Sequence, residues 1–366
     1  MPTNQDFKIA VFPGDGIGTE ITEPCVALVD AAVAKVGGFS VTNDWLEAGA
    51  AAYVNTGSAL PDPALDASRL CDAILLAAMG DPAIRYPDGT ELTPQIDMRF
   101  ELDLYAGVRP VRTIAGVPQV IADPQNRPID FVLIRESTEG LFVSLGKGVV
   151  ENDTIARDHL EITRKGTERV SRFSFDLARQ RKKAGHQGRV TLVDKANVFA
   201  SMAFMRKVFD EVADGYDDIE ADHAYVDAMA MRFVQRPWDY DVMVTENMFG
   251  DILSDLGAGL MGGLGFAPSA DIGDDHAVFQ PCHGSAPDIA GQGKANPTAM
   301  FLSAAMMLEW LGEKHEFEQA EIAGGLIRQA VDAAFASGDL LPYEIGGQAG
   351  TRQITDAVMA GLKQAL

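Results

Sequence analysis

Two aspartates four residues apart give the sharpest chemical signal in the sequence. Asp251 and Asp255 stand in NMFGDILSDLGAGL, where the apolar residues between and after them favour a helix. On a helix the two carboxylates share one face, where like charges repel each other unless a cation lies between them. Carboxylate oxygens are ligands that Mg²⁺ and Mn²⁺ prefer. The pair therefore indicates either a divalent metal site or an exposed helix face with two solvated aspartates.

A third carboxylate and an amine extend this chemistry. Asp227 lies in AYVDAMAMRF, among apolar residues, where an unpaired carboxylate is costly to bury. We therefore expect a metal or a lysine as its partner. Lys195 follows the apolar run VTLV, and it can serve as a general base if desolvation and its neighbours lower the pKa of its amine. The alternative is a surface lysine beside Asp194.

Three arginines supply groups that can bind a carboxylate. Arg135 directly follows the apolar run FVLI, Arg109 ends the segment LDLYAGVR, and Arg99 precedes that segment. Guanidinium groups bind carboxylates through two parallel N–H donors, and the carboxyl ends of buried strands are where α/β proteins bind ligands. The net charge of −23 repels anions, so an anion site has to be built locally from such side chains. A surface salt bridge is the alternative for each arginine alone.

Two loops rich in small residues are candidates for nucleotide contacts. In the glycine loop at 14–18, GDGIG, the third glycine of a GxGxxG fingerprint falls on Thr19, and no acidic residue ends a second strand at the right distance. We interpret this loop as a tight strand-to-helix turn. The second loop, HGSAPD at 283–288, precedes Asn296 and an expected helix N-terminus, whose backbone donors can cradle a phosphate or adenosine.

Short apolar runs and helical patterns alternate along the chain and position these residues. We expect buried strands over 8–12, 73–78, 131–134, 190–193 and 242–245, with helices such as 19–36, 201–213 and 297–311 between most of them. This alternation predicts an α/β protein with a largely parallel sheet. The polar stretch 151–157, after a glycine-rich segment, predicts a protruding arm.

The composition narrows the class of protein. With 366 residues, the chain has room for two domains or one large α/β unit. The excess of 53 acidic over 30 basic residues argues against nucleic acid and anionic membrane surfaces as partners. The 3 cysteines form no CxxC motif, so we expect neither disulfides nor a zinc site, and a reducing cytoplasm fits. We also expect no secretory leader and no membrane span.

Together these segments resemble the β-decarboxylating dehydrogenases, which act on isopropylmalate, isocitrate, homoisocitrate or tartrate and D-malate. The resemblance runs from FPGDGIG to IGGQAGT near Gly350. It implies an α/β, isopropylmalate dehydrogenase-like two-domain fold with a central cleft, not a standard Rossmann fold. Residues 1–105 and 262–366 would form the cofactor-side domain, and 106–261 the middle domain with the metal and substrate residues. A homodimer with shared active sites is implied.

The resemblance also assigns roles to individual residues. It implies that Mg²⁺ or Mn²⁺ is held by Asp227, Asp251 and Asp255, one of them from the partner subunit. Lys195, helped by Asp227, would be the general base and would also cross the dimer. The substrate would be bound by Arg99, Arg109, Arg135, Gln95 and Ile96. The cofactor would be bound by His283, Gly284, Ser285, Ala286, Asp288, Asn296 and Asn197. Because Asp288 stands where the family's carboxylate accepts bonds from the adenosine ribose, the expected cofactor is NAD.

Phe142 departs from the family pattern. It ends RESTEGLF, where the family has a proton-donating tyrosine, and a phenyl ring cannot donate a proton. Either Lys195, Tyr225 or water completes the reaction, or the last step is slow, or the reaction stops at the 2-oxo acid. This substitution also keeps open a non-catalytic regulatory subunit on the same scaffold.

The expected reaction is the oxidative decarboxylation of a 3-substituted malate. Gln95 and Ile96 replace the paired leucines of isopropylmalate enzymes and predict a mixed pocket. We expect 3-isopropylmalate as the first choice, tartrate or D-malate as the main alternative, and isocitrate or homoisocitrate next. A metal hydrolase without a cofactor is a further alternative, which leaves the loop at Asp288 unexplained.

Overall fold

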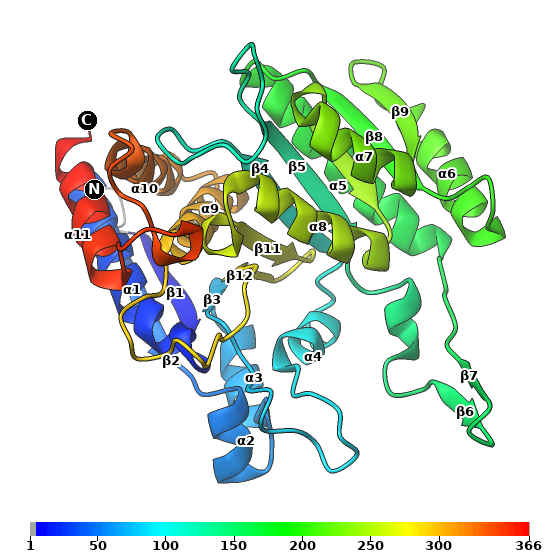
Figure 1. Ribbon diagram of the computed structural model, residues 1–366, viewed down its shortest axis with the longest axis horizontal. Helices are drawn as coiled ribbons and strands as arrows, with labels where there is room; N and C mark the ends of the chain where they lie inside the picture. The colour runs from blue at the N-terminus through cyan, green and yellow to red at the C-terminus, as the bar shows by residue number, and fades with distance from the viewer. Residues whose placement is uncertain (1–4, 366) are drawn as a thin grey trace.

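One continuous sheet of ten strands runs through the computed structural model, which describes residues 5–365. The strand order is β2-β1-β3-β12-β11-β4-β5-β10-β8-β9 (Figure 1). The strands are β1 (Gln5–Phe12), β2 (Phe39–Trp45), β3 (Ala73–Leu76), β4 (Ala106–Arg112), β5 (Asp130–Glu136), β8 (Arg189–Asp194), β9 (Glu220–Tyr225), β10 (Val242–Thr245), β11 (Pro268–Ile272) and β12 (Ala277–Pro281). All five expected strands are present, although the one predicted over 73–78 ends at Leu76.

The two ends of the sheet are parallel and its centre is antiparallel. The pairs β1–β2, β1–β3, β3–β12, β5–β10, β8–β10 and β8–β9 are parallel, which confirms the predicted largely parallel sheet. The pairs β11–β12, β4–β11 and β4–β5 are antiparallel. The strands β4 and β11 thus join the two parallel ends, and the sequence pattern did not predict this centre.

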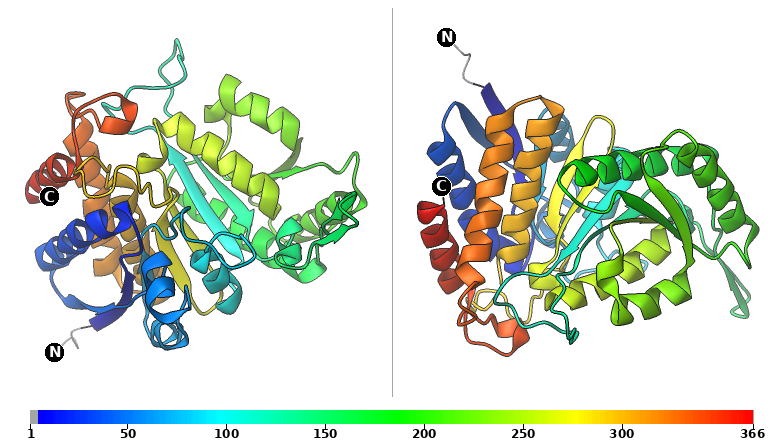
Figure 2. Two further views of the ribbon diagram at one scale, coloured as in Figure 1. Left: turned by 60° about the horizontal axis from the view of Figure 1, so that its bottom comes forward. Right: turned by 90° about the horizontal axis from the view of Figure 1, so that it is seen from above.

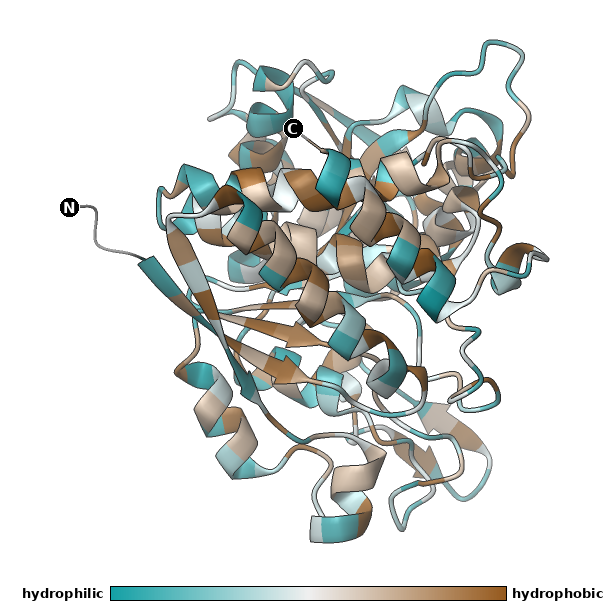
Figure 3. Cartoon of the chain, turned by 90° about the vertical axis from the view of Figure 1, so that its left-hand side faces the viewer, coloured by the Kyte–Doolittle hydropathy of each residue, from teal (hydrophilic) through white to brown (hydrophobic). Residues whose placement is uncertain are grey.

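Helices cover both faces of the sheet at the end that holds the two termini (Figures 1 and 2). One face is covered by α1 (Ile17–Val36) and α9 (Thr298–Lys314), with α10 (Glu318–Phe335) and α11 (Thr351–Gln364) outside them. The other elements of this end are α2 (Ala50–Thr56), α3 (Asp62–Arg69) and α4 (Pro94–Glu101). Figure 3 shows the strands behind the helices mainly in hydrophobic colour.

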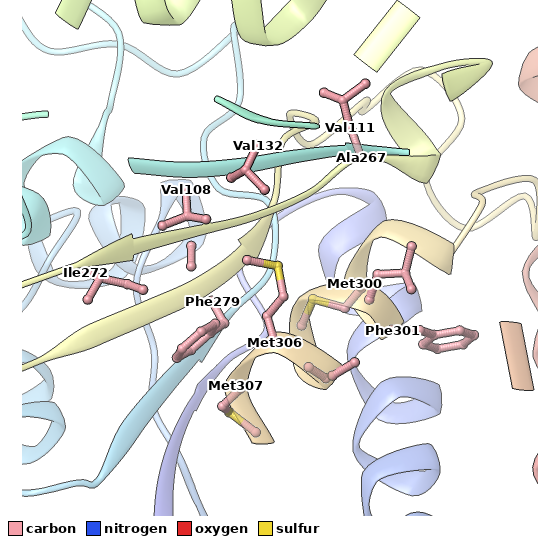
Figure 4. Packing of buried hydrophobic residues seen from close by; sticks show 14 of the residues in the cluster. Val108, Val111, Val132, Ala267, Ile272, Phe279, Met300, Phe301, Met306 and Met307 are labelled. Carbon is pink, nitrogen blue, oxygen red and sulfur yellow. The ribbon is translucent and has the colours of Figure 1, made fainter. Parts of the chain in front are cut away.

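The helix α9 is apolar on nearly all sides because it lies between the sheet and other helices. Its Met306 and Met307 pack near Phe279 of β12, and Val108 of β4 lies in the same cluster (Figure 4). These side chains are buried. The packing fixes the antiparallel centre of the sheet against a rigid helix.

The opposite end of the sheet is also covered on both faces. The helices α5 (Arg164–Lys183) and α6 (Ala200–Ala213) lie on one side, and α7 (Val226–Gln235) and α8 (Asn247–Met261) on the other. Short 3₁₀ turns occur at Leu141–Ser144, Pro237–Asp239, Leu264–Phe266 and Tyr343–Ile345. Within 5–365, no helix is both long enough and apolar enough to cross a membrane.

A two-stranded hairpin projects from this end of the molecule (Figure 1). It consists of β6 (Val149–Glu151) and β7 (Ile155–Arg157), and all six strand residues are exposed. The predicted protruding arm is therefore confirmed. The apolar residues Val149, Val150 and Ile155 stay in solvent in the single chain.

Candidate active site

A cavity of about 260 Å³ is lined by all five expected substrate residues. Its lining includes the predicted residues Gln95, Ile96, Arg99, Arg109, Arg135, Phe142, Asp251, Asp255, His283 and Gly284. They come from α4, from the antiparallel centre of the sheet, from α8 and from the loop that follows β12. Segments from both ends of the sheet therefore meet at this point.

The three arginines line the cavity although their side chains are almost completely buried. Arg135 lies within β5, not after it as the sequence pattern suggested, because the strand continues to Glu136. Its Nε and Nη2 donate to Asn247 Oδ1 at 2.9 and 2.7 Å. The Phe142 ring lies 5.1 Å from the Arg135 guanidinium carbon. The guanidinium is thus fixed before any ligand binds.

Asp271 is the charged residue of this site that the sequence did not reveal. It lies on β11, and its carboxylate accepts hydrogen bonds from Nη2 of Arg99 at 3.0 Å and Nη2 of Arg109 at 3.1 Å. The signal that could have found it is an acidic residue inside the apolar run FAPSADI. The run is not among the strands expected from the sequence, because Pro268 and Ser269 interrupt its apolar pattern.

The two aspartates of α8 both face the cavity, as their spacing predicts. The helix is held by Glu246, whose side chain caps the backbone N–H groups of Met248 and Phe249. Gly250 lets the helix approach β5, since a Cβ there would lie 2.7 Å from the Arg135 Cβ and Cγ atoms.

The environment of this carboxylate pair suits a divalent cation. Asp251 forms an ion pair with Arg135. Burial, and then the charge of Asp251, raise the pKa of Asp255. Each carboxylate disfavours the ionised form of the other, and a cation bound between them would stabilise both ionised forms. The oxygen donors present therefore fit Mg²⁺ or Mn²⁺.

Lys195 and Asp227 lie outside the cavity lining and bind each other, with 2.8 Å between Nζ and Oδ2. The hydrogen bond from Lys195 lowers the pKa of Asp227. The lysine partner expected for Asp227 is present, but the expectation of buried surroundings was wrong, since the Asp227 side chain is 69% exposed. Asp194 is instead paired with Arg206.

A single chain does not gather the three expected metal ligands. In the part of the chain that the structure describes, no group of three or more His, Cys, Asp or Glu side chains is arranged to hold a metal ion. Asp251 and Asp255 lie in the cavity, while Asp227 is at the surface on α7. The arrangement is compatible with the expected sharing of ligands between subunits.

The glycine loop has a structural role, as we interpreted it. The Asp15 carboxylate accepts hydrogen bonds from the backbone N–H groups of Ala50, Ala51 and Gly80 at 2.7–3.0 Å. A Cβ at Gly16 would lie 2.1 Å from the Ser285 carbonyl oxygen, and Ile17 N donates to that oxygen at 2.8 Å. The tight turn therefore holds the loop at 283–288 in place.

The expected cofactor residues are only partly brought together. His283 and Gly284 line the cavity, and His283 Nε2 is buried without a hydrogen-bond partner. The Asn296 side chain already forms hydrogen bonds within the chain, because its amide nitrogen donates to Glu344 and its Oδ1 accepts from Thr298.

The other expected cofactor residues have different surroundings. Ser285 is buried and Ala286 has a positive φ of 38°. Asp288 is exposed at the outer end of the loop. Asn197 is exposed near Lys195, outside the cavity lining, so the single chain does not bring it to the other cofactor residues.

Comparisons with known proteins agree over almost the whole chain. Residues 8–358 match the isocitrate/isopropylmalate dehydrogenase family. The 3-isopropylmalate/3-methylmalate dehydrogenase of Methanocaldococcus jannaschii is 41% identical, over 98% of this chain and 99% of that protein. The probable tartrate dehydrogenase/decarboxylase of Bacillus subtilis is 36% identical, over 99% of both chains. The crystal structure of isocitrate dehydrogenase from Methylococcus capsulatus has a TM-score of 0.85 at 37% identity, covering 98% of this chain and all of that one.

Proposed function

The chain belongs to the isocitrate/isopropylmalate dehydrogenase family, and from this premise we propose that it carries out the metal-dependent, NAD-linked oxidative decarboxylation of a 3-substituted malate. The observation that carries the proposal is the convergence of three buried guanidinium groups and two carboxylates on one cavity. The first substrate to test is 3-isopropylmalate.

In this proposal the arginines bind and orient the substrate. Arg99, Arg109 and Arg135 offer N–H donors to its carboxylates, and their burial keeps water from competing for those donors. Asp251 and Asp255, with Asp227 of the partner subunit, hold the divalent ion. When bound, the ion supplies Lewis-acid polarisation of the substrate oxygens and NAD⁺ supplies the hydride acceptor.

Proton transfer falls to the partner's Lys195. Its amine takes the proton of the substrate hydroxyl, and the ion pair to Asp227 in its own chain keeps that amine oriented. Phe142 lines the cavity without a group that could protonate the product. Lys195, Tyr225 or water then has to return a proton to C3, and of these Tyr225 lies with its ring 5.7 Å from Lys195 Nζ.

Exposed apolar side chains next to these residues support a homodimer. Met231 lies four residues after Asp227 on α7, so the two share a face. Ile252 stands beside Asp251 on α8, and Phe199 follows Lys195. The side chains of Met231, Ile252 and Phe199 are more than half exposed, at 52, 61 and 54%. A second copy covering this surface would bury them and bring the partner's Lys195 to the cavity.

The cofactor choice rests on Asp288. Its carboxylate is exposed and forms no ion pair within residues 5–365, so it is free to accept hydrogen bonds from ribose hydroxyls. A negative charge at this position disfavours a 2′-phosphate, which is why we propose NAD over NADP.

A second candidate function, tartrate or D-malate dehydrogenase, is favoured by one observation. Gln95 lines the cavity, and its Oε1 is buried without a hydrogen-bond partner. An additional substrate hydroxyl would satisfy this atom, whereas an isopropyl group would pack on the neighbouring Ile96. Isocitrate and homoisocitrate are further alternatives, and a regulatory subunit is disfavoured because the arginines, aspartates and lysine are all present.

The proposal is tested with a panel of 3-substituted malates, D-malate, tartrate and isocitrate, with Mn²⁺ and NAD⁺. NADH and carbon dioxide are measured together for each acid. We expect NADH formation with at least one of them and none after chelation of the metal. Absence of NADH with every acid in the panel would contradict the proposed function. A carbon dioxide yield below the NADH yield would show that the reaction stops early, at the step affected by Phe142.

A further inference from the structure

A buried carboxylate lies directly behind two of the cavity arginines. The Asp271 side chain is 1% exposed. It accepts hydrogen bonds from Arg99 and Arg109, and also from Nε2 of Gln280 at 2.8 Å. Asp271 is not part of the cavity lining, whereas Arg99, Arg109 and Gln280 are. Any effect of Asp271 on a ligand therefore acts through these neighbours.

The strand register places Asp271 at the centre of the arginine group. It pairs with Gly107 on β4, and Gly107 pairs with Arg135 on β5. A Cβ at Gly107 would lie 3.1 Å from Asp271 Oδ1 and 2.7 Å from Ser137 Oγ. The absence of a side chain at Gly107 thus provides the space in which the Asp271 carboxylate lies.

Hydrogen bonds within the chain hold the guanidinium groups of the two arginines in place. Arg109 also donates from Nη1 to the Ala270 carbonyl oxygen at 2.9 Å, so its guanidinium is held on both sides. Arg99 Nε is buried and has no hydrogen-bond partner. Asp271 therefore fixes both guanidinium groups.

The charges around Asp271 do not cancel. Burial alone would raise the pKa of its carboxyl group, but the charges of Arg99, Arg109 and Arg135 outweigh burial and hold that pKa below the usual value. Asp271 is thus ionised and neutralises one of three guanidinium charges. Two positive charges remain for a ligand, while the two α8 aspartates match the charge of a divalent cation.

We propose that Asp271 is a positioning residue that sets the charge class of the substrate, because it fixes Arg99 and Arg109 and limits the cavity to a net charge that suits a dicarboxylate better than a tricarboxylate. This inference rests on the proposed function, since it takes the arginines as the ligands of the substrate carboxylates. Without Asp271, an unmatched positive charge beside the cavity would favour an acid with a third carboxylate.

The test compares Asp271→Asn with the wild-type protein, using 3-isopropylmalate as the dicarboxylate and isocitrate as the tricarboxylate. Affinities are measured by calorimetry with Mg²⁺ and without NAD⁺, and kcat/KM is measured separately. We expect the ratio of isocitrate to isopropylmalate affinity to rise on the order of tenfold in D271N. In the wild-type protein Gln280 donates a hydrogen bond to Asp271. The double variant D271N/Q280E exchanges the amide and the carboxylate of this pair, so it should return the affinity ratio toward the wild-type value.

A charge-preserving variant separates charge from geometry. In Asp271→Glu the longer side chain displaces both guanidinium groups, so both affinities should fall while their ratio stays constant. A folded D271N protein with an unchanged ratio would overturn the inference, as would a D271N/Q280E protein that keeps the D271N ratio. If D271N does not fold, Gln280→Glu tests the inference in the opposite direction. The added carboxylate should lower the ratio of isocitrate to isopropylmalate affinity. An unchanged ratio in this variant would overturn the inference.

The same measurements distinguish this inference from the proposed function. Wild-type protein that binds neither acid would refute the proposed function, and the inference with it. Wild-type protein that binds at least one of them, with a ratio insensitive to Asp271, would refute the inference alone.

Discussion

The cavity arginines, with Asp271, and the Lys195–Asp227 pair hold their charged groups in two different environments. We call Arg99, Arg109, Arg135 and Asp271 the arginine group. Arg99, Arg109 and Asp271 are almost completely buried and hydrogen-bonded inside one chain. Lys195 and Asp227 form one ion pair at the surface, beside apolar side chains that remain in solvent. One half of the proposed site is thus complete within a single chain, and we propose that the other half is supplied by a second subunit.

The energetics of the two regions should differ accordingly. Removing one partner of a buried charge pair leaves the other uncompensated and costs about 3–5 kcal/mol, whereas exposed ion pairs contribute about 0–1 kcal/mol. We therefore expect mutations in the arginine group to affect folding and binding together. Mutations in the Lys195–Asp227 pair should instead affect turnover and metal binding, with little effect on folding.

The largest effect should come from Lys195→Met. Loss of the general base should lower kcat on the order of 10³-fold. The melting temperature should change little, because the Asp227 carboxylate that pairs with Lys195 is 69% exposed and can be solvated without it. Lys207→Met, which removes an exposed lysine on helix α6, is the control and should retain wild-type kcat. A K195M protein with wild-type turnover would remove Lys195 from the proposed chemistry.

Arg109→Leu should have the largest effect on stability. It leaves the Asp271 carboxylate with one guanidinium fewer, so the free energy of unfolding should fall by about 3–5 kcal/mol, measured by urea denaturation. Arg164→Leu removes an exposed arginine paired with Glu211 and should cost less than about 1 kcal/mol. Equal losses in the two variants would contradict the distinction between the regions.

Glu136 adds a pH dependence to the buried region. Burial raises its pKa from 4.5 to about 7, despite hydrogen bonds from Thr138 and Glu139. Between these values the folded state keeps the proton that the unfolded state has lost. Its stabilising contribution is therefore complete below pH 4.5 and is lost as the pH rises to about 7, a change of about 3 kcal/mol.

Urea denaturation at pH 5 and pH 8 measures this contribution. In Glu136→Gln the decrease in the free energy of unfolding between the two pH values should be smaller than in the wild-type protein. An identical decrease in both proteins would show that Glu136 does not titrate in this range.

A smaller effect is expected from Phe142→Tyr. The ring already lines the cavity, so an added hydroxyl should speed protonation of the product, about tenfold where that step limits turnover. Stopped-flow measurement of NADH and carbon dioxide release would resolve the step. Unchanged rates for all steps would mean that another donor, such as Lys195, already acts there.

Local pattern was enough to predict much of the buried region. The spacing of Asp251 and Asp255 predicted their common face, and the run before Arg135 predicted its strand. The pairing of Asp271 with Arg99 and Arg109 could not be predicted in this way, because these partners lie 172 and 162 residues away in the sequence and meet Asp271 only across the antiparallel centre of the sheet. No periodic pattern encodes that pairing.

The surroundings of Asp227 differ from the sequence prediction for another physical reason. The apolar residues around Asp227 suggested burial, and Met229 and Phe233 are indeed buried. Met231 and Val234, however, are exposed in the single chain. A sequence does not distinguish apolar residues that enter the core from those that we propose to be covered by a second subunit.

Subunit mixing tests the central claim, that the buried half and the exposed half of one active site come from different chains. Lys195→Met and Asp255→Asn homodimers should each be inactive. After denaturation and refolding together, half of the dimers should be mixed, and each mixed dimer has one site free of both substitutions. We predict recovery of about a quarter of wild-type activity, since that is the statistical fraction of intact sites. No recovery, with mixed dimers shown by mass spectrometry to have formed, would contradict the shared site.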